Sequence, residues 1–69
     1  MIVQVKGDCI RLGQFLKIAD IVGTGGEAKI RIQSGDIKVN GITETRRGLQ
    51  MKNCDVVEAD GMKFIVEYV

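Results

Sequence analysis

Two stretches of the chain carry apolar residues at helical spacing, and several others alternate between apolar and polar residues. The first helical stretch covers residues 12–22, and Gly23 is expected to end it. Apolar residues recur there at i, i+3, i+4, i+7 and i+10, the pattern of a helix that buries one face. Arg11 is a weak N-cap, and Lys17 lies off the apolar stripe and is expected to face solvent. The stripe consists of Leu12, Phe15, Leu16, Ala19 and Val22.

The second helix begins directly after the first and carries clear signals at both ends. Thr24 and Glu27 stand three residues apart, as a capping box requires, so each side chain is expected to bind a backbone amide of the other residue. Gly35 supplies the left-handed conformation that ends a helix with little strain. Glu27 and Arg31 are spaced as an i, i+4 surface pair. The inward residues of this helix are expected to be Ala28 and Ile32.

The alternating stretches predict short strands. Two dipeptides have a strong tendency to form hairpin turns, and each is expected to connect two consecutive strands. They are Asn40-Gly41 and Asp60-Gly61. Leu49 or Met51 is expected to anchor the connection over residues 46–52 to the core. The pattern therefore predicts an α+β fold, with two short packed helices on one side of a small mixed or antiparallel sheet. The strands are expected at residues 2–6, 37–40, 42–45, 55–58 and 62–68.

Length and charge limit the classes of protein to which the chain can belong. With 69 residues it is expected to form a single domain, residues 1–69, with a small core. No apolar run approaches the ~18 residues of a membrane span. The net charge is only +1, but residues 29–52 hold six basic side chains against two acidic ones, and residues 53–69 carry a net −3. This asymmetry predicts a polarised domain with one basic face.

The chemistry-bearing side chains do not form a recognisable catalytic or metal-binding set. Cys9 and Cys54 form no C-x-x-C pair and the chain has no His, so we expect reduced thiols, no zinc, no cofactor and a cytoplasmic location. Asp55, Glu58 and Asp60 are explained by strand ends and a turn. With no nucleophile beside a base, the chain is not expected to be an enzyme.

The glycine-rich run over residues 23–26 opens the second helix and has two readings. Bare amides at a helix N-terminus attract anions such as phosphate. The same glycines would also suit a tight turn between two helices. The run lacks the G-x-x-x-x-G-K-[ST] spacing of a nucleotide-binding loop, so no small-molecule substrate such as ATP or GTP is expected.

An ordered set of residues also resembles a known family. The set resembles the alpha-L RNA-binding motif, the domain named after ribosomal small-subunit protein four, over residues 11–58. The likeness is greatest to small stand-alone bacterial members, in which a Gly-Gly pair opens the second helix. The matching residues are Leu12-Gly-Gln-Phe-Leu-Lys, Ala28-Lys29, Ile32, Gly35, Ile37, Val39-Asn40-Gly41, Arg46-Arg47-Gly48 and Asp55-Val56-Val57.

This resemblance implies an RNA-binding surface and names its residues. In the family, RNA contacts the start of the second helix, the hairpin and the basic segment that follows. Many members have a Ser-Arg pair where this chain has Gly25-Gly26, and a Gly where it has Cys54. Carried over by position, the expected RNA-binding residues are Gly25, Gly26, Lys29, Lys38, Asn40, Arg46, Arg47 and Lys52.

Two functions remain open on the sequence. The first is binding of structured, ribosomal RNA by shape and phosphate contacts, without catalysis and with a role in ribosome assembly. The second is a protein-interaction module that keeps the fold but has little RNA affinity, and whose acidic C-terminal third docks a basic partner such as a ribosomal protein. The basic side chains over residues 29–52 would then form an ordinary solvated face.

Overall fold

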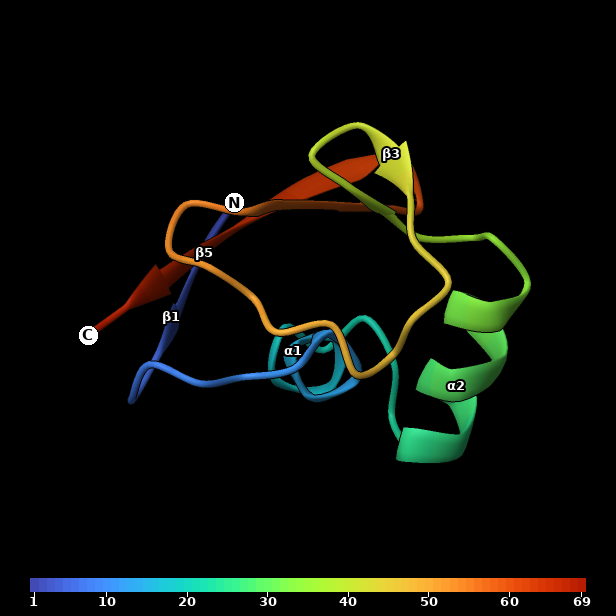
Figure 1. Ribbon diagram of the computed structural model, residues 1–69, viewed down its shortest axis with the longest axis horizontal. Coiled ribbons are helices and arrows are strands. Elements are labelled where there is room, and N and C mark those ends of the chain that lie inside the picture. The colour runs from blue at the N-terminus through green and yellow to red at the C-terminus, as the bar shows by residue number, and fades with distance from the viewer.

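Two helices cover one face of a five-stranded sheet in the computed structural model, which describes residues 1–69 (Figure 1). The helices are α1 (Leu12–Ile18) and α2 (Gly25–Gln33). The strand order in the sheet is β1-β5-β4-β2-β3. This arrangement confirms the α+β fold. The strands are β1 (Ile2–Val5), β2 (Lys38–Val39), β3 (Ile42–Thr43), β4 (Val56–Ala59) and β5 (Met62–Tyr68).

Two hairpins and one parallel pair make the sheet mixed. The β2–β3 hairpin turns at Asn40-Gly41 and the β4–β5 hairpin at Asp60-Gly61, and all four turn residues have positive φ, as predicted. Strand β1 joins the edge of the sheet parallel to β5, with Ile2 beside Ile65. Strand β3 is shorter than the predicted 42–45, because the chain leaves the sheet after the amide of Glu44 bonds the carbonyl of Ile37.

The first helix ends several residues before the predicted stop at Gly23. Helical structure stops at Ile18, and Asp20 takes a left-handed conformation with φ 60°. The amides of Ile21 and Val22 then both bond the carbonyl of Leu16, which closes the end of the helix. This turn folds Val22 back into the core, so an apolar residue at helical spacing is buried without being helical.

The second helix has the predicted ends, with one correction to its capping box. The Thr24 hydroxyl accepts a hydrogen bond from the amide of Glu27 at 3.1 Å, and Gly35 follows the helix with φ 83°. The Glu27 carboxylate, however, accepts from the amide of Gly23 at 2.7 Å instead of that of Thr24. The extended backbone at Thr24 presents the earlier amide to the carboxylate.

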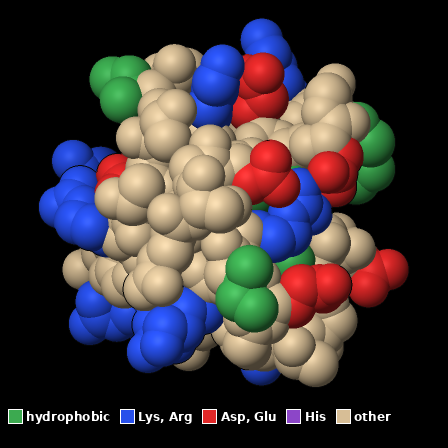
Figure 2. Space-filling view, turned by 90° about the vertical axis from the view of Figure 1, so that its right-hand side faces the viewer, with side chains coloured by type: hydrophobic (Ala, Val, Ile, Leu, Met, Phe, Trp, Pro, Cys, Tyr) green, Lys and Arg blue, Asp and Glu red, His purple; other side chains and the backbone are tan.

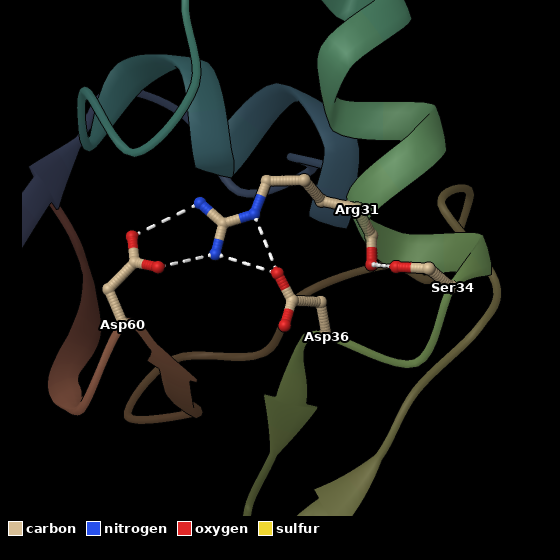
Figure 3. Close-up of polar contacts among 4 residues, drawn as sticks. All are labelled: Arg31, Ser34, Asp36 and Asp60. Atoms are coloured by element: carbon tan, nitrogen blue, oxygen red, sulfur yellow. Dashed lines mark hydrogen bonds and ion pairs between the residues drawn. The ribbon is translucent and has the colours of Figure 1, made fainter.

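Arg31 does not form the predicted surface pair with Glu27. Its guanidinium donates to both carboxylate oxygens of Asp60, at 2.7 and 3.1 Å, and to Asp36 at 3.0 Å (Figure 3). Glu27 is already engaged as a cap, and Arg31 lies on the side of α2 nearest the β4–β5 turn. The two ion pairs therefore link α2 to the sheet.

The core is wholly apolar and combines the helix stripes with alternate strand residues. Met51 is 1% exposed and anchors the connection after β3, as predicted, while Leu49 packs against the core and is only partly buried. No polar or charged residue is buried. The fifteen core residues are Val5, Ile10, Leu12, Phe15, Leu16, Val22, Ala28, Ile32, Ile37, Val39, Met51, Val57, Ala59, Phe64 and Val66.

The Arg31–Asp60 pair should make stability depend on pH. Hydrogen bonds from Arg31 lower the pKa of Asp60 in the folded state, whereas the side chain of an unfolded Asp has a pKa of about 3.9. The pair therefore stabilises the fold above that pH, and its contribution is lost as the pH falls toward the lower folded value. Asp60→Asn keeps a residue that tolerates the left-handed turn but removes the charge.

We expect Asp60→Asn to lower the free energy of unfolding at pH 7, with the difference from wild type shrinking as the pH drops below about 4. Urea unfolding at a series of pH values measures this. Asp8→Asn is the matched control, because Asp8 is exposed and its carboxylate forms neither a hydrogen bond nor an ion pair. A difference between wild type and Asp60→Asn that stayed constant down to pH 2 would contradict the stabilising role of the pair.

Candidate nucleic-acid interface

The connection between β3 and β4 lies against the N-terminus of α1 (Figure 1). The amide of Leu12 donates to the carbonyl of Leu49 at 2.9 Å, and that of Gly13 donates to the carbonyl of Arg47 at 3.0 Å. A Cβ on Gly13 would lie 3.5 Å from that Arg47 oxygen, an ordinary van der Waals distance, so the contact does not itself require a glycine. These contacts satisfy amides that have no partner within the helix and place Arg47 beside α1.

Tyr68 holds the other end of this connection. Its hydroxyl donates to the carbonyl of Met51 at 2.6 Å and accepts from the amide of Ile10 at 3.1 Å. The amide of Met51 in turn donates to the carbonyl of Ile10 at 2.8 Å. The last strand, the segment before α1 and the connection are thereby joined at one point.

A hollow of about 270 Å³ opens where α1, the start of α2 and the connection meet. We call it the basic hollow, because three cations line it and no carboxylate does. The Arg11 guanidinium donates to the carbonyl of Gly48 at 2.7 Å, which orients it along the rim. The lining residues are Arg11, Gly13, Gln14, Lys17, Gly25, Ala28, Arg47 and Gly48.

The structure brings only two of the predicted RNA-binding residues, Gly25 and Arg47, to this hollow. Gly26 and Lys29 lie on α2 and are exposed, but they do not line the hollow. Arg46 is also exposed, and its Nε lies 2.9 Å from Glu44, so its charge is paired within the chain. Hydrogen bonds from Arg46 lower the pKa of Glu44 and keep that carboxylate charged.

The other three predicted residues, Lys38, Asn40 and Lys52, lie outside the lining of the basic hollow. Lys38 stands opposite Glu58 in the sheet, in a separate hollow on the side of the β4–β5 turn that also contains Asp36 and Asp60. Asn40 uses its side chain within the fold, donating to Asp55 at 3.0 Å and accepting from the amide of Val56 at 2.9 Å. Lys52 is exposed, and its backbone amide donates a hydrogen bond to the Asp55 carboxylate at 2.7 Å. RNA contact by these residues stays a prediction.

Two cations of the basic hollow, Arg11 and Lys17, were missed at the sequence level. Arg11 is the N-cap of α1 and Lys17 is exposed, as the sequence predicts, but neither expectation identifies a binding residue. Together with Gln14 they recur every three residues along α1, and this polar stripe beside the apolar one was the available signal.

The glycines that open α2 are not required by the fold. A Cβ on Gly25 would meet nothing within 4 Å, and one on Gly26 would meet only the Thr24 hydroxyl at 3.9 Å. Neither residue has positive φ. Glycine is a poorer helix residue than Ala, so neither glycine is explained by the stability of α2. The interpretation that the turn between the helices requires glycine is therefore not supported at Gly25 and Gly26.

Charges of opposite sign are only partly separated on the face drawn in Figure 2. Lys and Arg side chains lie at the left, lower left and top, and most Asp and Glu side chains lie right of centre, where they surround a further cation. Cys9 and Cys54 are exposed free thiols, and no cluster of three His, Cys, Asp or Glu residues could hold a metal ion. Neither helix has the length and apolar character needed to span a bilayer.

Comparison with known proteins identifies the family. The S4 domain model matches residues 3–67. The chain belongs to the S4 domain family. It is 39% identical over 59 residues to the probable ribosome maturation protein RlbA of Bacillus subtilis (strain 168), covering 86% of this chain and 83% of that protein.

A solved structure has the same fold. It is the 30S ribosomal protein S4e from Thermoplasma acidophilum, with a TM-score of 0.57 and 24% identity. The match covers 81% of this chain but only 29% of the ribosomal protein, so the present chain corresponds to one part of that longer protein. The family resemblance inferred from the sequence is thus confirmed.

Because the Tyr68 hydroxyl ties the connection in place, Tyr68→Phe should destabilise the protein by about 1–2 kcal/mol. The change removes one donor and one acceptor and leaves the amide of Ile10 and one acceptor site on Met51 without that partner. The midpoint of urea unfolding measures the effect. An unchanged midpoint would mean that water replaces the hydroxyl without loss.

Proposed function

We propose that this S4 domain binds structured RNA, with ribosomal RNA as its target, through the basic hollow and the start of α2, and that it acts without catalysis. The family and the relative named as a ribosome maturation protein support a ribosome-related role in the cytoplasm. The observation that supports this proposal most directly is that Arg11, Lys17 and Arg47 line one hollow that no carboxylate lines. The domain would contribute to ribosome maturation by occupying this RNA.

The geometry suits a phosphate backbone better than a small anion. The cations come from two segments and surround an open hollow instead of a closed cage. A-form RNA offers a regular array of phosphates that a rigid basic surface can match by shape. Gly25 lines the same hollow without a side chain and Gly26 follows it on α2, so a phosphate can approach the amides that begin α2.

The remaining predicted residues would extend this contact. Lys29 and Lys52 are exposed and unpaired, so they are proposed as outer phosphate contacts. Arg46 could join them only by exchanging Glu44 for a phosphate. Lys38 and Asn40 are left outside the proposed interface, since Lys38 lies among carboxylates and Asn40 is bound within the fold.

The protein-interaction alternative has less support. Its acidic surface, the C-terminal third of the chain, holds Asp55, Glu58, Asp60 and Glu67. Asp60 already pairs with Arg31, and Asp55 accepts from Asn40 and from the amide of Lys52. A basic partner would therefore find only Glu58 and Glu67 free of these contacts. The basic hollow has no such internal counter-ion at Lys17 or Arg47.

The first test compares Arg47→Ala with Lys38→Ala, which removes the same charge outside the hollow. Each phosphate contact contributes about 0.7–0.9 to the slope of log K against log salt. Arg47→Ala should therefore flatten the slope by roughly one unit and weaken RNAs of different sequence alike. Lys38→Ala should leave the slope nearly unchanged. Titrations of ribosomal RNA fragments at several salt concentrations measure both, and equal effects of the two variants would reject the basic hollow as the site.

The second test separates binding from stability at Gly25. Gly25→Ala should leave stability unchanged or raise it by up to about 1 kcal/mol, because a Cβ fits there and Ala favours the helix. The same change should weaken RNA binding, because the new methyl group stands between the amides and a phosphate. Urea unfolding and an RNA titration on the same sample provide both values. Wild-type RNA affinity in this variant would remove the start of α2 from the interface.

A further inference from the structure

A second hollow lies next to the basic hollow, on the other side of α1. It measures about 340 Å³ and shares Gln14 and Lys17 with the basic hollow. We call it the apolar hollow, because four of its seven lining residues are hydrophobic. The seven lining residues are Val5, Lys6, Cys9, Ile10, Gln14, Lys17 and Ile18.

The walls of this hollow are apolar where the core reaches the surface. Val5 and Ile10 belong to the core, at 5% and 6% exposure, and form its inner wall. Ile18, at the end of α1, is 52% exposed and forms the outer wall without packing into the core. The hollow is shallow and open to solvent, so a flat ring would lie against its inner wall without being enclosed.

The polar groups around the apolar hollow suit a base attached to phosphates. Lys6 and Lys17 provide positive charge, and no carboxylate lines the hollow. The Oε1 of Gln14 is occupied by the amide of Arg11 at 3.1 Å, so its Nε2 is the group left to donate to a ligand. The Gln14 amide can donate to a carbonyl or ring nitrogen of a base, and the apolar wall can contact its flat face. The two lysines can bind the phosphates on either side of that base.

We propose that the apolar hollow receives one unpaired nucleobase of the RNA whose backbone crosses the basic hollow. The inference rests on the proposed function and deepens it, because it names the RNA feature that is recognised. Bases in bulges and loops are unstacked and can be held between apolar side chains, whereas bases in a continuous helix cannot leave it without cost. The two hollows meet at Gln14 and Lys17, so adjacent nucleotides can occupy both.

The experiment measures binding of three RNA duplexes at one salt concentration. One carries a single unpaired nucleotide, the second has an abasic site at that position, and the third is fully paired. Wild-type protein should bind the duplex with the unpaired base about fivefold more tightly than the abasic one, because the base buries apolar surface against aliphatic side chains. The abasic and fully paired duplexes should bind with similar affinity, through phosphates alone.

Matched isoleucine variants test the site itself. Ile18→Ser should reduce the ratio between the unpaired-base and abasic duplexes toward one and leave the salt slope unchanged. Ile30→Ser is the control, since Ile30 is 70% exposed on α2 and lines neither hollow. Both isoleucines lie at the surface, and an unchanged urea midpoint would confirm that each variant folds.

The outcomes distinguish the two levels of the hypothesis. Equal binding of the unpaired-base and abasic duplexes by wild type overturns the nucleobase site and leaves the proposed RNA-binding function intact. A loss of the ratio that is as large in Ile30→Ser as in Ile18→Ser also overturns the site. Failure to bind any of the three duplexes overturns the proposed function, and the nucleobase site with it.

Discussion

The backbone contact between residues 47–49 and the first turn of α1 is the interaction on which the rest of the structure depends. A helix leaves its first amides without partners, and the carbonyls of Arg47 and Leu49 supply them for α1. To reach that position the chain must leave the sheet soon after Thr43, which limits the length of β3. The same path brings Met51 into the core and Arg47 to the edge of the basic hollow.

Internal pairing of charges accounts for a hollow lined by cations alone in a chain with a net charge of only +1. Arg31 is bound by Asp36 and Asp60, and Arg46 by Glu44, so three carboxylates are paired away from this hollow. The cations around the basic hollow remain without carboxylate partners. Helix α1 then separates three roles by position, with core residues on one side, a polar stripe toward the basic hollow, and Ile18 at the apolar hollow.

Much of the fold could be predicted from the sequence because its signals are local. The turns at Asn40-Gly41 and Asp60-Gly61 follow from residues that tolerate positive φ, and the start and end of α2 follow from Thr24 and Gly35. Alternation of apolar residues predicted the strands, and together with the helix stripes it predicted most of the core. The family resemblance added Gly25 and Arg47, two of the residues that line the basic hollow.

Other features were decided only by the tertiary structure. Periodicity extended the first helix to Val22, because burial at helical spacing looks the same whether the backbone is helical or folded back. The partner of Arg31 lies on a distant hairpin, which no i, i+4 rule can identify. Arg11 and Arg47 share one hollow only because the connection docks on α1. The sequence by itself determined the elements, the hairpin turns and the ends of α2, since those depend on neighbouring residues, whereas the packing of distant segments determined where β3 ends and which side chains meet.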